Sequence, residues 1–155
     1  MQVSATEEYG LRCLLRVYYH EGAEAITVQQ IATQEGLTPE YVAKLMRPLR
    51  AGSLVTANRV PGGGYRRARK PSEVNVWDVM GLLGSGVMSE VFCDRYSPKS
   101  GECVHTVDCS IRAMWKQAEQ LLRGLFEHLT LEDLRRGEGP MARWLESSNP
   151  VPIKD

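Results

Sequence analysis

Two short amphipathic segments joined by a glycine turn constrain the fold of this chain more than any other feature. Thr27 can cap a helix that ends at Gly36, where glycine supplies a left-handed residue. Thr38-Pro39-Glu40 then offers a capping hydroxyl, proline at the first helical position and an acid, which predict the start of a second helix. The apolar residues of this second segment recur at helical spacing: Val42, Leu45, Met46 and Leu49. Two short helices joined in this way are typical of a helix-turn-helix.

A β-hairpin is predicted directly after these helices. Residues 54–60 have the pattern of a strand, residues 61–64 (PGGG) form a tight turn, and residues 65–68 return as a second strand. A hairpin in this position is a wing. We therefore expect a mainly α fold with a small β-wing, in which residues 1–71 form a winged helix-turn-helix.

A short helix marked by Val76, Val79, Met80 and Leu83 is predicted after the wing, ending at Gly84. Two further helices are predicted outside this motif. The first runs from about Thr6, a plausible N-cap, to His20. The second is a long amphipathic helix of about 20 residues that begins at Ser110. A chain of this size offers the long helix no obvious partner that could cover its apolar face. We therefore expect it to be the dimerisation helix of a homodimer, within a unit of residues 72–134. The alternative is that the long helix folds back over the winged helix of its own chain. Residues 135–155 are expected to form a C-terminal tail.

Charge is distributed unevenly along the 155 residues. Lysine plus arginine number 19 and aspartate plus glutamate number 19, so the formal net charge is zero. Residues 44–70 nevertheless carry no acid and concentrate eight basic side chains: Lys44, Arg47, Arg50, Arg59, Arg66, Arg67, Arg69 and Lys70. Such a block is typical of a surface that binds a polyanion, although a solvated basic face without a partner is the simpler alternative.

The helix-turn-helix and the wing together favour double-stranded DNA as that polyanion. The N-terminal residues of a recognition helix face base edges in the major groove, and arginine in a wing suits a narrow minor groove. Symmetric dimers suit palindromic operators. The candidate DNA-contacting residues are Thr38, Tyr41, Lys44, Arg47, Arg59, Gly63, Tyr65, Arg66 and Arg67.

The cysteines divide into one isolated residue and one cluster. Cys13 lies in an apolar helix, where a small buried hydrophobe is expected. Cys93, Cys103 and Cys109 fall in a polar loop, and three clustered cysteines in an intracellular chain favour a metal site over disulfides. Thiolates suit iron–sulfur clusters and zinc. Cys109 directly precedes the long helix, whose N-terminus favours negative charge.

The chain resembles the IscR/NsrR/RirA-type family of winged-helix transcription regulators over nearly all of residues 1–134. The matching pieces are TEEYGLRCLL, IATQEGLTPEYVAKLMRPLRAGSLV, RVPGGGYRRARKP, VNVWDVMGLL, three cysteines in a loop and the long helix after them. The wing is the most specific of these. The resemblance implies a dimeric DNA-binding regulator, here expected to be a repressor, that senses iron–sulfur status, iron, nitric oxide or redox state.

The resemblance also implies a ligand set. Cys93, Cys103 and Cys109 would hold a two-iron or four-iron cluster, and the first gap between them is longer than the family's usual one. The histidine that some members place three residues after the last cysteine is Arg112 here. The acid that others supply from the partner's first helix is Glu8, so Glu8 is the expected fourth ligand. The fallback ligands are His105 and Asp108, and Glu8 is otherwise an ordinary acid at a helix start.

Two other functions remain open at this stage. One is a DNA-binding regulator whose cysteines hold zinc or act as a thiol switch, and the other is a small redox enzyme that uses the same cysteines. Enzyme patterns such as a nucleotide-binding glycine loop or a catalytic triad are missing from the sequence, so we expect no enzyme. No apolar run could span a bilayer and the N-terminus is acidic, so we expect a cytoplasmic protein that does not bind membranes.

Overall fold

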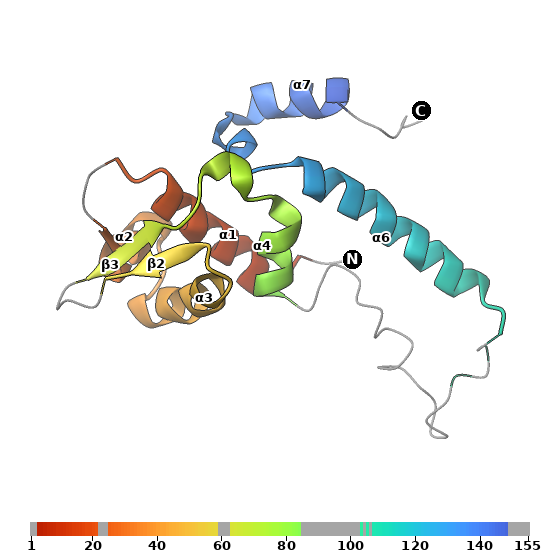
Figure 1. Ribbon diagram of the computed structural model, residues 1–155, viewed down its shortest axis with the longest axis horizontal. Helices are drawn as coiled ribbons and strands as arrows, with labels where there is room; N and C mark the ends of the chain where they lie inside the picture. The colour runs from red at the N-terminus through yellow and green to blue at the C-terminus, as the bar shows by residue number, and fades with distance from the viewer. Residues whose placement is uncertain are drawn as a thin grey trace.

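The structure, a computed structural model, describes residues 3–21, 25–58, 63–84, 103, 105 and 107–148. Within these ranges the chain is mostly helical with one small sheet, which confirms the predicted fold class (Figure 1). The elements in chain order are α1 (Ala5–Tyr18), β1 (Ile26–Thr27), α2 (Val28–Glu35), α3 (Pro39–Ala51), β2 (Val55–Ala57), β3 (Gly64–Arg67), η1 (Pro71–Glu73), α4 (Val76–Leu83), α6 (Ser110–His128), η2 (Asp133–Arg135) and α7 (Glu138–Ser148). None of the described helices is both long and apolar enough to cross a bilayer.

Helix α1 begins two residues earlier than the sequence suggested. Ser4, not Thr6, is the N-cap, because Ser4 and Glu7 form a reciprocal capping box. The Ser4 hydroxyl accepts from the Glu7 amide at 3.3 Å, and the Glu7 carboxylate accepts from the Ser4 amide at 2.8 Å. The expectation that Thr6 caps this helix was therefore wrong, since a serine followed three residues later by glutamate satisfies two otherwise unpaired amides.

The helix-turn-helix is confirmed in its details. Thr27 caps α2, and Gly36 closes that helix with φ 67° in the left-handed region. Thr38 caps α3 by accepting from the Tyr41 amide at 3.3 Å, and Pro39 takes the first helical position. Each of these local signals acts within about one helical turn of its own position, which is why the sequence was sufficient to predict them.

Helix α3 passes through Pro48 and ends in a left-handed residue. The Gly52 amide donates to the Pro48 carbonyl at 2.9 Å, so the last turn closes with a regular α-helical bond. The Ser53 amide then donates to the Arg50 carbonyl and the Leu54 amide to the Leu49 carbonyl, both at 3.0 Å. This pair of bonds is a Schellman motif, and it holds Ser53 at φ 58°.

Glycine suits the position of Ser53 better than serine does. Replacing Ser53 with glycine is expected to raise the free energy of unfolding by about 0.5–1 kcal/mol, because a left-handed conformation strains any residue with a Cβ. The matched opposite change is Gly36→Ala, where nothing lies within 4 Å of an added Cβ. That variant is expected to lose about 1 kcal/mol from backbone strain alone. Urea unfolding of both variants checks the two signs.

The wing belongs to a three-stranded antiparallel sheet in the order β1-β3-β2. Strand β1 was not predicted, because two residues carry no recognisable periodicity. It pairs with β3 through Ile26 opposite Tyr65 and Thr27 opposite Gly64. A Cβ at Gly64 would lie 2.1 Å from the Ile26 carbonyl oxygen, so the pairing requires glycine there.

Elements α1 to α4 with the sheet form one body, which we call the winged-helix head. Its core is built from side chains that are at most 1% exposed: Leu14, Ile31, Val42, Leu45, Met46, Leu49, Val55, Val79 and Leu131. Leu131 comes from the segment after α6 and is completely buried in this core. The end of α6 is therefore fixed to the head.

Helix α6 leaves the head as an extended arm (Figure 1). Its last turns pack on α4 and α7 through a second apolar cluster whose buried members are Val76, Met80 and Leu129. Near its N-terminus, α6 exposes large apolar side chains: Ile111 is 61% exposed and Met114 is 54% exposed. No residue of α6 is fully buried, although the structure describes its whole length. Residues 135–155, expected to form a tail, contain the helix α7.

Candidate functional site

The surface of α3 presents three basic side chains to solvent, Lys44, Arg47 and Arg50, of which the first two are predicted DNA contacts. Lys44 and Arg47 are three residues apart and both exposed, so they share the outer face of the helix. Thr38 is also exposed, but its hydroxyl already accepts the Tyr41 amide as N-cap. Lys44 and Arg47 therefore lie on one face of α3, and Thr38 lies at its N-terminus.

Tyr41 differs from its neighbours because its ring is half-buried. It packs edge-on against the ring of Tyr9 on α1, with centroids 6.2 Å apart and planes at 77°. Sequence reasoning placed Tyr41 on the outer face only. The structure instead uses it to connect the recognition helix to α1.

The hairpin separates the two adjacent arginines of the wing. Arg66 lies opposite the exposed Thr56, and Arg67 lies opposite Val55, which is 1% exposed. Opposed residues share a face of a sheet and successive residues alternate, so Arg66 starts from the outer face and Arg67 from the face that covers the core. The sequence analysis placed both among the DNA-contacting residues without separating their faces.

The remaining wing candidates are only partly placed. Tyr65 is half-buried on the same face as Arg67, opposite Ala57, and Gly63 is half-buried at the start of the returning strand. Arg59, the predicted minor-groove residue, lies outside the described residues. The position of the tip relative to DNA therefore stays a prediction.

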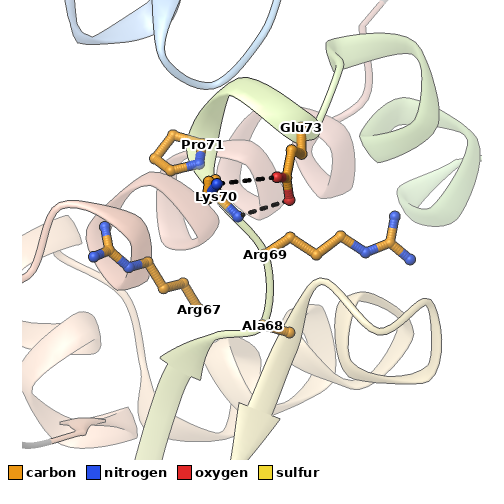
Figure 2. A pocket seen from close by; sticks show the side chains of 6 residues that line it. All are labelled: Arg67, Ala68, Arg69, Lys70, Pro71 and Glu73. Carbon is orange, nitrogen blue, oxygen red and sulfur yellow. Dashed lines mark hydrogen bonds and ion pairs between the residues drawn. The ribbon is translucent and has the colours of Figure 1, made fainter.

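A shallow basic pocket of about 380 Å³ lies at the base of the hairpin. Figure 2 shows Arg67 and Arg69 pointing away from each other across it. The third cation, Lys70, pairs with Glu73 at 3.8 Å. Because the guanidinium groups diverge, the pocket contributes positive field rather than a converging site for a single anion.

Cys109 occupies the N-cap of the arm helix. Its Sγ accepts from the Arg112 amide at 3.4 Å, at the end of α6 where the helix dipole favours negative charge. The Arg112 guanidinium donates to the His105 carbonyl at 3.3 Å, which ties the preceding loop to the same turn. The predicted placement of a thiol at a helix N-terminus is confirmed.

The other predicted ligands that the structure describes do not form a group with Cys109 in one chain. Cys103 is half-buried, His105 and Asp108 are exposed, and Cys93 lies outside the described residues. Among the residues that the structure does describe, no three metal-binding side chains come together. The donor chemistry fits an iron–sulfur cluster, because two accessible thiols stand within seven residues and one caps a helix.

Cys13 is excluded as a ligand by its surroundings. Its side chain is completely buried in the head, as the sequence predicted. Burial raises the pKa of its thiol to about 11, so it stays protonated at neutral pH. A metal ligand must be the thiolate.

Glu8 is already engaged in this structure. Arg12, one turn further along α1, donates to the Glu8 carboxylate at 2.7 Å. This bond raises the pKa of Arg12 above its ordinary value. The same guanidinium lies 5.8 Å from the centroid of the Tyr9 ring, which in turn contacts Tyr41. A continuous set of contacts thus runs from the candidate ligand to the recognition helix, and the Glu–Arg spacing of four was its sequence signal.

A known family model matches most of the chain. The family model Rrf2, described as an iron-dependent transcriptional regulator, matches residues 3–137. The chain belongs to the Rrf2 family. It is therefore a transcriptional regulator of a DNA-binding family, and the resemblance drawn from the sequence is confirmed.

Rrf2 relatives match most of the chain. It is 29% identical over 136 residues to Protein rrf2 of Nitratidesulfovibrio vulgaris, covering 88% of each chain. It is 28% identical over 134 residues to the HTH-type transcriptional regulator IscR of Escherichia coli, covering 86% of this chain and 80% of that one.

Solved structures share the fold of this chain. The cysteine regulator CymR of B. subtilis superposes with a TM-score of 0.68 at 24% identity, over 86% of this chain and 95% of that one. IscR of T. potens superposes with a TM-score of 0.64 at 21% identity, over 100% and 93%. These two likenesses concern the winged-helix fold.

Proposed function

We propose that this Rrf2-family protein is a homodimeric transcription repressor whose affinity for a palindromic operator is controlled by an iron–sulfur cluster. Its ligands are Cys93, Cys103 and Cys109, with Glu8 from the other copy of the chain. The observation that carries the proposal is Cys109, whose sulfur accepts a backbone amide at the N-terminus of the arm helix. A bound cluster supplies an oxidisable, nitric-oxide-reactive centre whose loss frees the thiols.

The exposed apolar face of α6 supports the homodimer. Ile111, Met114 and Leu121 are each at least 45% exposed, and Trp115 is 36% exposed. A second copy of α6 would remove this surface from water, and burial of side chains that start about half exposed contributes about 1 kcal/mol each. Two arms packed together would present two heads to the two half-sites of a palindrome.

The contacts around Glu8 support coupling between the cluster and DNA. When Glu8 serves as a ligand, its carboxylate is drawn away from Arg12. Arg12 then loses the anion that holds it over Tyr9. Because Tyr9 packs on Tyr41, the recognition helix would change its packing beside Lys44 and Arg47.

A thiol switch is the second candidate function. Cys103 and Cys109 are half-buried and therefore accessible to oxidants. One structure of similar fold, with a TM-score of 0.66 and 23% identity over 88% of this chain and 98% of that one, is the oxidized form of Staphylococcus aureus CymR. In this alternative the same two thiols would respond to oxidation without iron.

Anaerobic purification distinguishes these functions. The proposal expects iron and acid-labile sulfide in equal amounts, visible charge-transfer absorption, and a change in operator affinity when the cluster is removed. A colourless protein that contains stoichiometric zinc, or neither metal nor sulfide, would leave the thiol switch or a plain DNA-binding regulator.

Glu8→Ala tests the fourth ligand. We expect the visible spectrum of the cluster to change and the cluster to be lost faster in air, because three thiolates leave one iron site open. The control is Glu138→Ala, which removes an exposed acid from the first turn of α7. A spectrum identical to that of the wild type would transfer the role to His105 or Asp108.

A further inference from the structure

Two adjacent tyrosines at the end of α1 make equivalent bonds to different parts of the molecule. The Tyr18 hydroxyl donates to the Leu54 carbonyl at 2.8 Å, entirely within the winged-helix head. The Tyr19 hydroxyl donates to the carbonyl of Leu131, which follows the arm helix and lies 112 residues away in sequence. Only the second bond crosses from the head to the segment that carries the arm.

The Tyr19 bond reinforces a short backbone pairing that we call the joint, formed by residues 74–76 and 129–131. The Val76 amide donates to the Leu129 carbonyl at 2.8 Å, and the Leu131 amide donates to the Val74 carbonyl at 3.0 Å. Asn75 and Thr130 form the β-bridge between these two bonds. The joint is the place where the arm enters the head.

Both the hydroxyl and the ring of Tyr19 contact the segment after α6. The Arg135 guanidinium lies 5.4 Å from the centroid of the Tyr19 ring. Arg135 is the last residue of η2. Burial raises the pKa of Tyr19 above its ordinary value, so the hydroxyl remains a donor at neutral pH. Tyr19 therefore fixes the far side of the joint to α1.

A small rotation at the joint has a large effect at the other end of the arm. The 19 residues of α6 extend about 28 Å at the α-helical rise. A rotation of about 7° about the joint therefore displaces the far end of the arm by about 3.4 Å, the rise of one base pair. The spacing of two heads on DNA depends on how rigidly each arm is held.

We propose that Tyr19 is a positioning residue that sets the half-site spacing accepted by the dimer. It does so by bonding α1 to the base of the arm, and it contacts neither the DNA nor the cysteines. This inference rests on the proposed function, because it requires two heads on one palindromic operator.

The test compares Tyr19→Phe with Tyr18→Phe in the full chain. Each change removes one hydroxyl bond to a backbone carbonyl and keeps the ring. Affinity is measured for the native operator and for operators with one base pair inserted or deleted between the half-sites. We expect Tyr19→Phe to reduce the preference for native spacing by roughly fivefold, the factor that corresponds to the loss of one ordinary hydrogen bond, and Tyr18→Phe to leave that preference unchanged.

The outcomes separate the inference from the proposed function. If the wild type prefers one spacing and both variants keep that preference, Tyr19 has no positioning role and the proposed function stands. If the wild type ignores spacing, both the proposed dimer on a palindrome and the spacing role are wrong. Hydrogen exchange at the Leu131 and Val76 amides gives an independent readout. We expect faster exchange in Tyr19→Phe only, and equal protection in all three proteins would overturn the role.

Discussion

Replacing Cys103 with alanine is expected to abolish the cluster and, with it, the control of operator binding. Three cysteines are the minimum thiolate set for the proposed centre, and the chain supplies no spare thiol because Cys13 is completely buried. Iron and acid-labile sulfide should fall to background after anaerobic purification. The winged-helix head should remain folded, since Cys103 contributes nothing to its core.

Cys13→Ala is the matched control for this experiment. It removes a thiol from the core of the head and is expected to lower the free energy of unfolding by about 1 kcal/mol, the typical cost of a core truncation of this size. Its iron content should equal that of the wild type, because the Cys13 side chain is completely buried among core residues of the head. A full cluster in Cys103→Ala, or a lost cluster in Cys13→Ala, would contradict the ligand assignment.

Reversing the charge of Arg47 is expected to weaken operator binding about 100-fold or more. Arg47 is exposed on the outer face of α3 beside Lys44, so glutamate there would replace attraction to DNA with repulsion in both copies of the dimer. Lys44→Glu should act in the same direction. Binding is measured by titration with labelled operator at fixed salt, because the electrostatic part of the affinity depends on salt.

Arg143→Glu serves as the control for net charge. Arg143 is an exposed arginine on α7, outside the helix-turn-helix and the wing. It should bind the operator within about twofold of the wild type, since distant exposed charges are screened at physiological salt. Equal losses in Arg47→Glu and Arg143→Glu would show that overall charge, rather than the surface of α3, governs binding.

For the wild type we expect the affinity to fall with salt at a logarithmic slope of about −7.

Much of the candidate site could be predicted because its signals are local. Thr38 and Pro39 predict the start of the recognition helix from neighbouring residues alone, and Cys109 directly precedes the helix that it caps. Lys44 and Arg47 follow from the apolar stripe of the same helix, which assigns the opposite face to solvent. Each of these predictions needs only the chain on either side of one residue.

The missed features depend on contacts between distant segments. Tyr41 carries a polar hydroxyl and lies outside the apolar stripe of α3. Nothing in its own helix therefore predicts that its ring packs on Tyr9. The two residues of β1 become a strand only because β3 lies beside them. Helix α7 gains its stability from α4 and the end of α6, with which it shares an apolar cluster.

The sequence by itself determined that this protein has a capped helix-turn-helix, a glycine hairpin rich in arginine, and a thiol at the start of a long amphipathic helix. These follow from hydrogen bonds and side-chain periodicities that act over three or four residues. Only the tertiary structure decided that the hairpin turns Arg66 and Arg67 to opposite faces, and that Tyr19 bonds the first helix to Leu131. The reason is that burial of one face and the meeting of residues 112 positions apart depend on how whole elements pack, which no local pattern encodes.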